Sequence, residues 1–239
     1  MQMILQESLQ KVDIALNKMV STKELFEIRT PYLTELFAAV QYPWEIFSEI
    51  KCYMKKLMAE PPVGFTFLKE GVLIGENVII SPAATIEAPA LIGSGTEIRP
   101  GAYIRGNVIT GADCVIGNSS ELKNCVLLEH VQVPHYNYVG DSVLGNGAHM
   151  GAGSICSNLK SGGGSVTVHG EEEYPTGLRK LGAILGDGAD IGCGCVLNPG
   201  TVVGKNTNVY PLTSVRGVID ANCIVKTMEN IVKKEETKT

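Results

Sequence analysis

Residues 74–109 read IGENVI ISPAAT IEAPAL IGSGTE IRPGAY IRGNVI in groups of six, and every group begins with isoleucine. The period continues through Thr110, Ile116, Leu122 and Leu128. Nine of these ten positions are therefore aliphatic, and a smaller residue stands four places after each of the first nine, from Val78 to Val126. A strict six-residue period of this kind predicts short strands in a chain that coils on itself, with each coil stacked on the last.

The same register returns twice further along the chain. Its later aliphatic positions are Leu144, Met150, Leu185, Ile191, Leu197, Val203, Val209 and Val215, and its later small positions are Ala148, Ser154, Ala189, Cys195, Thr201, Thr207 and Thr213. Glycine directly follows many of the aliphatic residues, as at Gly75 and Gly93, where a tight bend favours a residue without a Cβ atom. We therefore expect a mainly β protein, a parallel β-helix of hexapeptide repeats with coils about 4.8 Å apart.

The composition fits a repetitive scaffold and argues against several classes of function. The chain of 239 residues has 27 glycines and only 6% aromatic residues. Its formal net charge of −5 argues against a main role in neutralising phosphates, so we expect no nucleic-acid partner. Met1–Val20 carries Glu7, Lys11 and Asp13 among its apolar positions, so we expect no secretory signal, no membrane span and a cytoplasmic location. The seven cysteines show no framework of close pairs and are expected to be reduced.

Three segments of different character follow from these patterns. Residues 1–62 are expected to form a small helical region, because Ser21–Glu24 reads as a capping box and Pro31 and Pro43 each suit a first helical turn. We expect this region to cap the open end of the β-helix, where unpaired strand edges would otherwise aggregate. Residues 63–225 form the predicted β-helix. Residues 226–239 are predicted to be a charged tail, either a frayed helix or disordered.

The six-residue period fails in two places, which we interpret as loop insertions at residues 129–142 and 157–180. A repeat structure that interrupts itself usually does so to present a loop. The first interruption contains His135, Tyr138, Gly140 and Asp141 in the spacing His-x-x-Tyr-x-Gly-Asp. Because a repeat fold does not by itself fix a function, the interruptions are where the functional residues should be sought.

Together with its flanking sequences, this motif resembles a known family. The flanks are Arg99-Pro-Gly-Ala102, Glu121-Leu-Lys123-Asn124 and Gly151-Ala-Gly-Ser-Ile-Cys-Ser-Asn158. Over about residues 98–209 the chain is similar to the acetyltransferase domain of the bifunctional N-acetylglucosamine-1-phosphate uridyltransferase and glucosamine-1-phosphate acetyltransferase. The resemblance implies a left-handed β-helix with three hexads per coil, acetyl-CoA as acyl donor and an amino sugar phosphate as acceptor. It also implies a homotrimer with sites between subunits.

The resemblance assigns roles to residues around the acceptor. It implies that His135 is the general base that takes a proton from the attacking amine, a role suited to a side chain with an ordinary pKa of about 6.5. It implies that Arg99 and Lys123 hold the phosphate side of the acceptor. Tyr138 would contact the acceptor too. The remaining acceptor residues by this resemblance are His149, which stands where the family has an asparagine, and Lys180 at the end of the second interruption.

The spacing alone also brings basic residues together. With 18 residues in a coil, Glu87, Arg105 and Lys123 occupy one outward column, and Arg99 lies on the adjacent face. A ladder of salt bridges would explain why Glu87 and Arg105 stack in this column. Lys123 stacked on Arg105 is repulsive unless the two cations share an anion. A sugar phosphate would be such an anion.

For the acyl donor, the resemblance implies binding by the backbone of Ala152, by Asn158 and by Cys193, where the family has a serine. Backbone N–H groups and a side-chain amide suit a developing oxyanion. Leu159 replaces a tyrosine of the family. The changes at His149, Leu159 and Cys193 concern the acceptor sugar and the fit of the donor more than the type of reaction.

Two other interpretations stay open. The same three changes are what a catalytically silent or regulatory β-helix, related to nucleotide-sugar pyrophosphorylases, would show. His130, His135 and His149 could instead form a three-histidine zinc site like that of the β-helical carbonic anhydrases, whereas acetyl transfer needs no metal. Uridyl transfer is not expected, because residues 1–60 contain no glycine and hence no glycine-rich phosphate loop.

Overall fold

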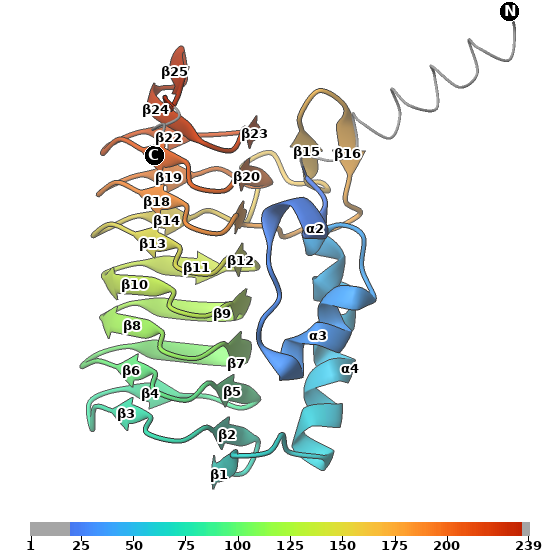
Figure 1. Ribbon diagram of the computed structural model, residues 1–239, viewed down its shortest axis with the longest axis vertical. Helices are drawn as coiled ribbons and strands as arrows, with labels where there is room; N and C mark the ends of the chain where they lie inside the picture. The colour runs from blue at the N-terminus through green and yellow to red at the C-terminus, as the bar shows by residue number, and fades with distance from the viewer. Residues whose placement is uncertain (1–19, 236–239) are drawn as a thin grey trace, which may run out of the picture.

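The computed structural model describes residues 20–235 of the chain. These residues form a parallel β-helix whose coils stack along the long axis of the molecule, with helices lying along one side (Figure 1). The predicted mainly β fold of stacked coils is confirmed. The helical prediction for residues 1–19 lies outside the described residues. Within residues 20–235, no helix is long and apolar enough to cross a membrane.

Strand pairing divides each coil into three faces. Face 1 contains β3 (Ile79–Ile80), β6 (Glu97–Ile98), β8 (Val115–Asn118), β10 (Gln132–His135), β13 (His149–Met150), β18 (Asp190–Ile191), β21 (Asn208–Val209) and β24 (Cys223–Thr227). Face 2 contains β4 (Thr85–Ile86), the first parts of β7 (Tyr103–Thr110) and β9 (Glu121–Leu127), then β11 (Tyr138–Gly140), β14 (Ile155–Cys156), β19 (Val196–Leu197) and β22 (Ser214–Val215). Face 3 contains β2 (Val72–Ile74), β5 (Ala90–Ile92), the second parts of β7 and β9, then β12 (Val143–Leu144), β17 (Ala183–Leu185), β20 (Thr201–Val203) and β23 (Val218–Ile219).

The core of the β-helix consists of the periodic residues that point into the coils. Ile92, Ile98 and Ile104 are all buried, as are Leu197 and Val203 in the later coils. Burying one such side chain stabilises the fold by about 1.5–3 kcal/mol. All seven cysteines are unpaired in the structure, and burial raises the pKa of the inward Cys114 and Cys156 to about 12.

The first interruption of the period is not a loop insertion, because two corners of the β-helix are one residue short. Arg105 pairs with Lys123 eighteen residues later, but Val108 pairs with Cys125 seventeen residues later. This corner therefore consists of Asn124 alone, where the corner of the preceding coil has two residues. One coil further on, the same corner consists of Asp141 alone. β10 and β11 continue the coil in register with β8 and β9, so the loop predicted at 129–142 is wrong.

The short corner also changes which side chains face inward. Cys125 and Leu127 lie in the core of the β-helix, whereas Val126 and Leu128 face outward against the helices. The prediction that Val126 and Leu128 are inward is therefore wrong by one residue. A shift of one residue moves a strand's side chains to the opposite face, and the change of corner length accounts for it.

The second interruption is a true excursion from the coil. After β14 the chain leaves the β-helix and forms an antiparallel hairpin of β15 (Thr167–His169) and β16 (Glu173–Pro175) before it returns at β17. Val166 and Val168 of this hairpin are buried. Tyr174 packs on Tyr42 and Trp44, with ring centroids 5.5 and 6.0 Å away. The excursion is thus held between the helices and the coils.

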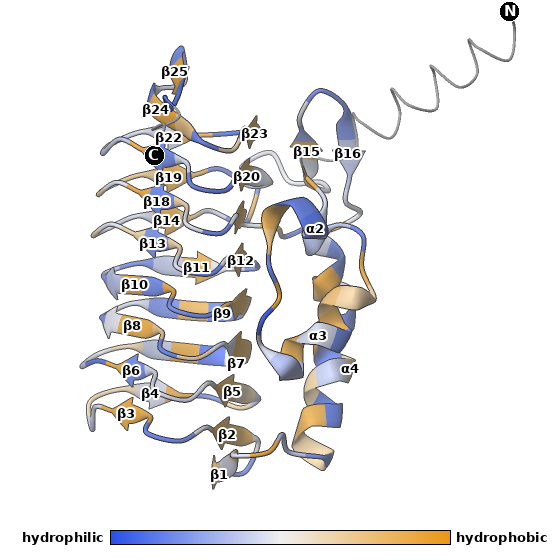
Figure 2. Ribbon diagram, in the orientation of Figure 1, coloured by the Kyte–Doolittle hydropathy of each residue, from blue (hydrophilic) through white to orange (hydrophobic). Residues whose placement is uncertain are grey.

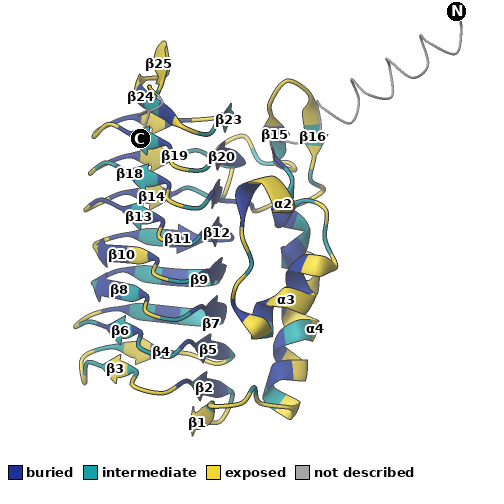
Figure 3. Cartoon of the chain, viewed as in Figure 1, coloured by how far each residue is buried: buried dark blue, intermediate teal, exposed yellow. Residues whose placement is uncertain are grey.

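The helices begin at the predicted capping serine and prolines, but they do not cap the open end of the β-helix as predicted. They are α2 (Thr22–Leu25), α3 (Pro31–Ala38), η1 (Pro43–Glu45) and α4 (Ile46–Ala59), and Ser21 caps α2 by accepting a hydrogen bond from the N–H of Glu24. They cover face 3 along its length, and not the open end (Figures 1 and 3). Outward aliphatic residues on successive coils, among them Leu73, Leu91 and Ile109, need this cover. Figure 2 shows the apolar side of the helices turned toward that face.

Antiparallel strands close both ends of the β-helix. β1 (Thr66–Lys69) pairs with β2 at one end, and β25 (Asn230–Lys233) pairs with β24 at the other. Residues 230–233 therefore form a strand, where the sequence predicted a frayed helix or disorder. The reason is that the last coil offers unpaired backbone N–H and C=O groups, which an added strand satisfies.

Candidate functional site

Three of the predicted site residues stack on the edge between faces 1 and 2. His135, Ala152 and Cys193 occupy the same place in successive coils, above Asn118. Backbone hydrogen bonds link the column: Gly153 N–H donates to the His135 carbonyl at 3.0 Å, and Gly194 N–H donates to the Ala152 carbonyl at 2.8 Å. The parallel stacking thus brings together the predicted base and two of the residues predicted for the donor. We name this edge the His135 edge.

A buried asparagine fixes the backbone at His135. The side chain of Asn137 is inward and only 2% exposed. Its Oδ1 accepts from the His135 N–H at 3.0 Å, and its Nδ2 donates to the carbonyl of Gly151 at 2.8 Å. Sequence reasoning missed Asn137, although it occupies the inward small position that Ser120 and Ser154 occupy in the neighbouring coils. Its amide ties the His135 turn to the coil that carries Ala152.

The polar groups on the His135 edge are available to a ligand. The imidazole of His135 is exposed and forms no hydrogen bond or ion pair within residues 20–235. The backbone N–H groups of Ala152 and Cys193 donate to no acceptor in this described part of the chain, and both residues are exposed. A free imidazole with free N–H donors on the next coils is a fitting set for an acyl donor, whose carbonyl oxygens accept hydrogen bonds.

Face 2 carries a row of polar side chains beside this edge. Arg105 pairs with Lys123 in register, and Glu121 pairs with Tyr138. Arg105 donates to Glu121 at 2.8 Å, whereas Lys123 has no carboxylate partner among the described residues. The predicted pairing of Glu87 with Arg105 is wrong. Glu87 instead accepts a hydrogen bond of 2.6 Å from the Tyr103 hydroxyl.

The short corners between faces 2 and 3 hold a buried carboxylate. Asp141 is 6% exposed and accepts from Asn124 Nδ2 at 2.7 Å and from Asn158 Nδ2 at 2.5 Å. Asn158 Nδ2 also lies 3.2 Å from the Tyr138 hydroxyl. Burial raises the pKa of Tyr138, and the charge of Asp141 raises it further. Asn158 thus connects Tyr138 to Asp141, and sequence reasoning missed the roles of Asn124 and Asp141.

The other predicted acceptor residues lie apart from this cluster. Arg99 follows β6 on face 1 and pairs with Glu97 at 3.0 Å, and this hydrogen bond lowers the pKa of Glu97. His149 is also on face 1, where its Nδ1 lies 2.8 Å from Asp190 Oδ1. Lys180 is exposed at the end of the excursion. The structure therefore spreads the predicted acceptor residues over face 1, face 2 and the end of the excursion.

The three histidines of the zinc hypothesis are not brought together. His130 precedes β10 and His135 ends it, and His130 Nδ1 is 3.9 Å from Asp113 Oδ2. His149 is held by Asp190. Among residues 20–235, no three or more His, Cys, Asp or Glu side chains are grouped so that they could hold a metal ion.

Comparisons with known proteins find a matching family model, sequence relatives and similar solved structures. The family described as the GMPPB C-terminal domain matches residues 86–173. The bifunctional protein GlmU of Methanococcus vannielii is 32% identical over 235 residues, which cover 93% of this chain and 52% of that protein. The bifunctional sugar-1-phosphate nucleotidylyltransferase/acetyltransferase of Sulfurisphaera tokodaii is 33% identical over 182 residues, which cover 71% of this chain and 43% of that protein.

The chain is a homologue of GlmU bifunctional proteins. It spans about half the length of the GlmU relatives that it matches. Similar solved structures include the acetyltransferase domain of PglB from Neisseria gonorrhoeae in complex with acetyl coenzyme A, with a TM-score of 0.33 and 16% identity, covering 77% of this chain and 64% of that one. Another is a mutant of AntD, an N-acyltransferase from Bacillus cereus, in complex with dTDP and coenzyme A, with a TM-score of 0.38 and 19% identity, covering 73% of this chain and 92% of that one.

Proposed function

We propose that this GlmU homologue is a cytoplasmic N-acyltransferase that uses acetyl-CoA to acetylate an amino sugar phosphate, glucosamine 1-phosphate or a related sugar. The observation that carries the proposal is the His135 edge, which stacks a free imidazole with the free N–H groups of Ala152 and Cys193. The Sulfurisphaera tokodaii relative, whose name includes an acetyltransferase, supports the same reaction class.

His135 is the general base of the proposed reaction. It accepts the proton that the amine loses while the amine nitrogen forms its bond to the acetyl carbon. The carbon–sulfur bond breaks, and the proton leaves with the thiol of CoA. The N–H groups of Ala152 and Cys193 are the proposed donors to the carbonyl oxygens of the acyl donor, where negative charge develops. Asn137 positions His135 through its backbone N–H.

The acceptor phosphate is assigned to the basic residues on both sides of this edge. Lys123 on face 2 is the strongest candidate, because Arg105 beside it is already paired with Glu121. Tyr138, in the adjacent column, offers a hydroxyl to the sugar. Arg99, His149 and Lys180 remain candidates for the acceptor, and Asn158 for either substrate through its position beside Tyr138.

The test is an assay that follows release of the CoA thiol from acetyl-CoA with a panel of amino sugar phosphates. We expect turnover with at least one of them and a loss of about 10²–10⁴-fold in kcat for His135→Ala, the usual contribution of a general base. His130→Ala, an exposed histidine of the same coil, should match the wild type. Lys123→Gln should raise KM for the acceptor more than it lowers kcat.

Two results would overturn this proposal. Absence of turnover with every amine would favour the catalytically silent β-helix. Turnover that His135→Ala leaves unchanged would remove His135 from the reaction, whichever sugar is the acceptor.

We also propose that the chain assembles as a homotrimer with its sites between subunits. Large apolar side chains are exposed along the His135 edge and on face 2: Leu212 is 83% exposed, Tyr136 65% and Ile155 38%. Face 3 is already covered by the helices. Sedimentation equilibrium should give three times the chain mass of 25.5 kDa, and Leu212→Glu should dissociate the trimer. Ile79→Glu, at an exposed position on the N-terminal coil, is the control, and a monomeric wild type would contradict the proposal.

A further inference from the structure

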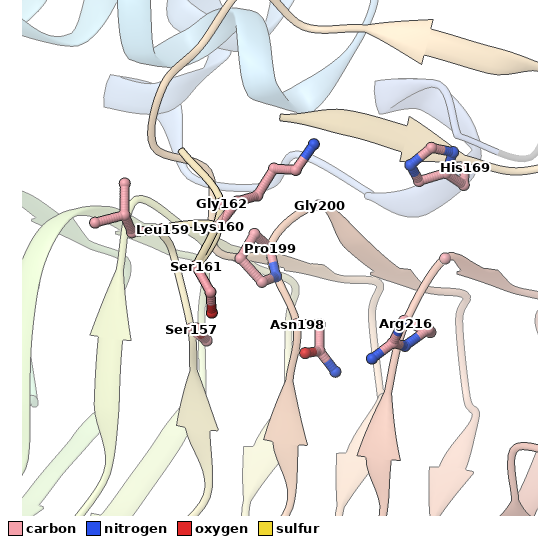
Figure 4. Close-up of a pocket in the computed structure, with 11 residues that line it drawn as sticks. Ser157, Leu159, Lys160, Ser161, Gly162, His169, Asn198, Pro199, Gly200 and Arg216 are labelled. Atoms are coloured by element: carbon pink, nitrogen blue, oxygen red, sulfur yellow. The ribbon is translucent and has the colours of Figure 1, made fainter. Parts of the chain in front are cut away.

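The excursion and the later coils enclose a pocket of about 340 Å³ on the corner between faces 2 and 3 (Figure 4). Its polar lining residues are Ser157, Lys160, Ser161, His169, Asn198 and Arg216. This corner is a different one from the His135 edge. Leu159, which replaces a tyrosine of the resembled family, lines the pocket, but neither it nor any other lining residue is given a role in the proposed acetyl transfer. The two proposals are therefore tested on different residues.

The lining of this pocket is basic in an acidic protein. It contains Lys160, His169 and Arg216, and it contains no aspartate or glutamate. The whole chain has a formal net charge of −5. Ser157, Ser161 and Asn198 add hydroxyl and amide groups to the same wall. The wall therefore offers positive charge together with neutral hydrogen-bond donors.

The positive charges in the pocket are not neutralised by carboxylates in the lining. Arg216 is exposed and forms no ion pair with the described residues. Lys160 Nζ donates to the Ser165 carbonyl at 3.3 Å, and His169 Nδ1 lies 3.3 Å from Glu173, which is outside the lining. Figure 4 shows Arg216 reaching toward Asn198 from the coils, while Lys160 and His169 stand on the excursion opposite.

Two glycines let the excursion sit directly on the coils and so fix the pocket's shape. A Cβ atom on Gly200 would lie 2.8 Å from Val166 Cγ1 and 3.0 Å from the Thr167 carbonyl oxygen. A Cβ atom on Gly217 would lie 2.9 Å from the His169 carbonyl oxygen. Both glycines also have a positive φ, of +80° and +73°. The strand that ends at His169 is thereby held against the corner where Gly217 follows Arg216.

We propose that this pocket binds the phosphate group of a small phosphorylated molecule. The planar guanidinium of Arg216 suits two oxygens of one phosphate, and Lys160 adds a second positive charge on the excursion side of the pocket. Serine hydroxyls complete such sites as neutral donors. The volume lies at the lower end of the range of about 300–1,000 Å³ for small-molecule pockets. It suits a phosphorylated metabolite or a diphosphate group better than an extended polymer.

Calorimetric titration of the full chain with inorganic pyrophosphate at low ionic strength tests this inference. We expect one binding site per chain, and Arg216→Gln and Lys160→Gln should each weaken binding by about tenfold or more, because each removes a charged hydrogen-bond donor. Arg179→Gln is the matched control, since Arg179 is exposed on the same excursion but does not line the pocket. All variants should keep the wild-type thermal midpoint, because these side chains are at the surface.

The same titration distinguishes the pocket from the proposed acceptor site. Binding that Lys123→Gln abolishes and Arg216→Gln leaves unchanged would place the anion on face 2 and overturn the inference. So would the absence of pyrophosphate binding, or equal weakening by Arg179→Gln. None of these three results by itself decides whether acetyl transfer occurs, because the thiol-release assay reports that separately.

Discussion

The two interruptions of the six-residue period look alike in sequence and are opposite in structure. Between Glu129 and Ser142 the chain keeps its coil. The corner at Asn124, just before this stretch, and the corner at Asp141, within it, are each one residue short. Between Ser157 and Lys180 the chain leaves the coil altogether and adds a hairpin. Loss of a period therefore marks either a change of phase or an added segment, and only the pairing of neighbouring coils separates the two.

The two kinds of interruption also build different sites. The change of phase keeps His135 in register with Asn118 and Ala152, so the residues of the first interruption are held by the stacked coils. The excursion instead lays a hairpin over a corner and encloses a basic pocket. The geometry of a site made of stacked corners depends on the spacing of the coils. The geometry of a site under a hairpin depends instead on how the hairpin packs against the coils.

The largest expected effect comes from a methyl group between the coils of the first interruption. In Gly117→Ala the new Cβ would lie 1.6 Å from the Pro134 carbonyl oxygen, so the coils must separate. We expect the free energy of unfolding to fall by about 3 kcal/mol or more, the upper range for overpacking. Gly162→Ala, in the second interruption, meets nothing within 4 Å and should change it by less than about 0.5 kcal/mol. Urea unfolding measures both, and equal effects would contradict the contrast.

A smaller loss is expected when the carboxylate of the short corners is removed. Asp141→Ala leaves the amides of Asn124 and Asn158 without their acceptor and puts alanine at a φ of +48°. We expect a loss of about 2–3 kcal/mol in the free energy of unfolding. Asp141→Asn keeps the shape and tolerates a positive φ, and should lose only about 1 kcal/mol. An alanine variant as stable as the asparagine variant would show that the bridge contributes little.

The sequence alone predicts the inward residues well wherever the corners have their full length. From Ile92 to Ile104 the six-residue period finds the buried side chains, because each hexad contributes one inward isoleucine. After Lys123 it fails by one residue, since a missing corner residue leaves no trace in the composition of the next strand. Val126 and Leu128 are as aliphatic as the inward Leu127, so hydrophobicity does not distinguish the two registers.

The position of the helices could have been predicted from a signal of longer period. Leu73, Leu91 and Ile109 recur every 18 residues, each just before an inward position of face 3 that holds Ile74, Ile92 or Thr110. An outward aliphatic column of this kind must be covered. The site was predictable only in part, for a similar reason. His135, Ala152 and Cys193 come from a motif, but Asp141 acts through Asn124 and Asn158, which are neighbours only after the coils stack.

The smallest expected effect tests whether the length of a corner or the length of a loop has the larger influence on the free energy of unfolding. One glycine inserted between Asn124 and Cys125 would give this corner the two residues of the preceding coil and move the Asn124 amide away from Asp141. The lost hydrogen bond should cost about 1 kcal/mol in the free energy of unfolding. The same glycine inserted between Gly163 and Gly164 lengthens a turn with open space around it and should cost less than about 0.5 kcal/mol, because loop entropy grows slowly with length. A larger loss of stability from the turn insertion would contradict this expectation. It would show that the excursion tolerates a change of length less well than the corner, and the close contact of its hairpin with Gly200 and Gly217 would be the first explanation to test.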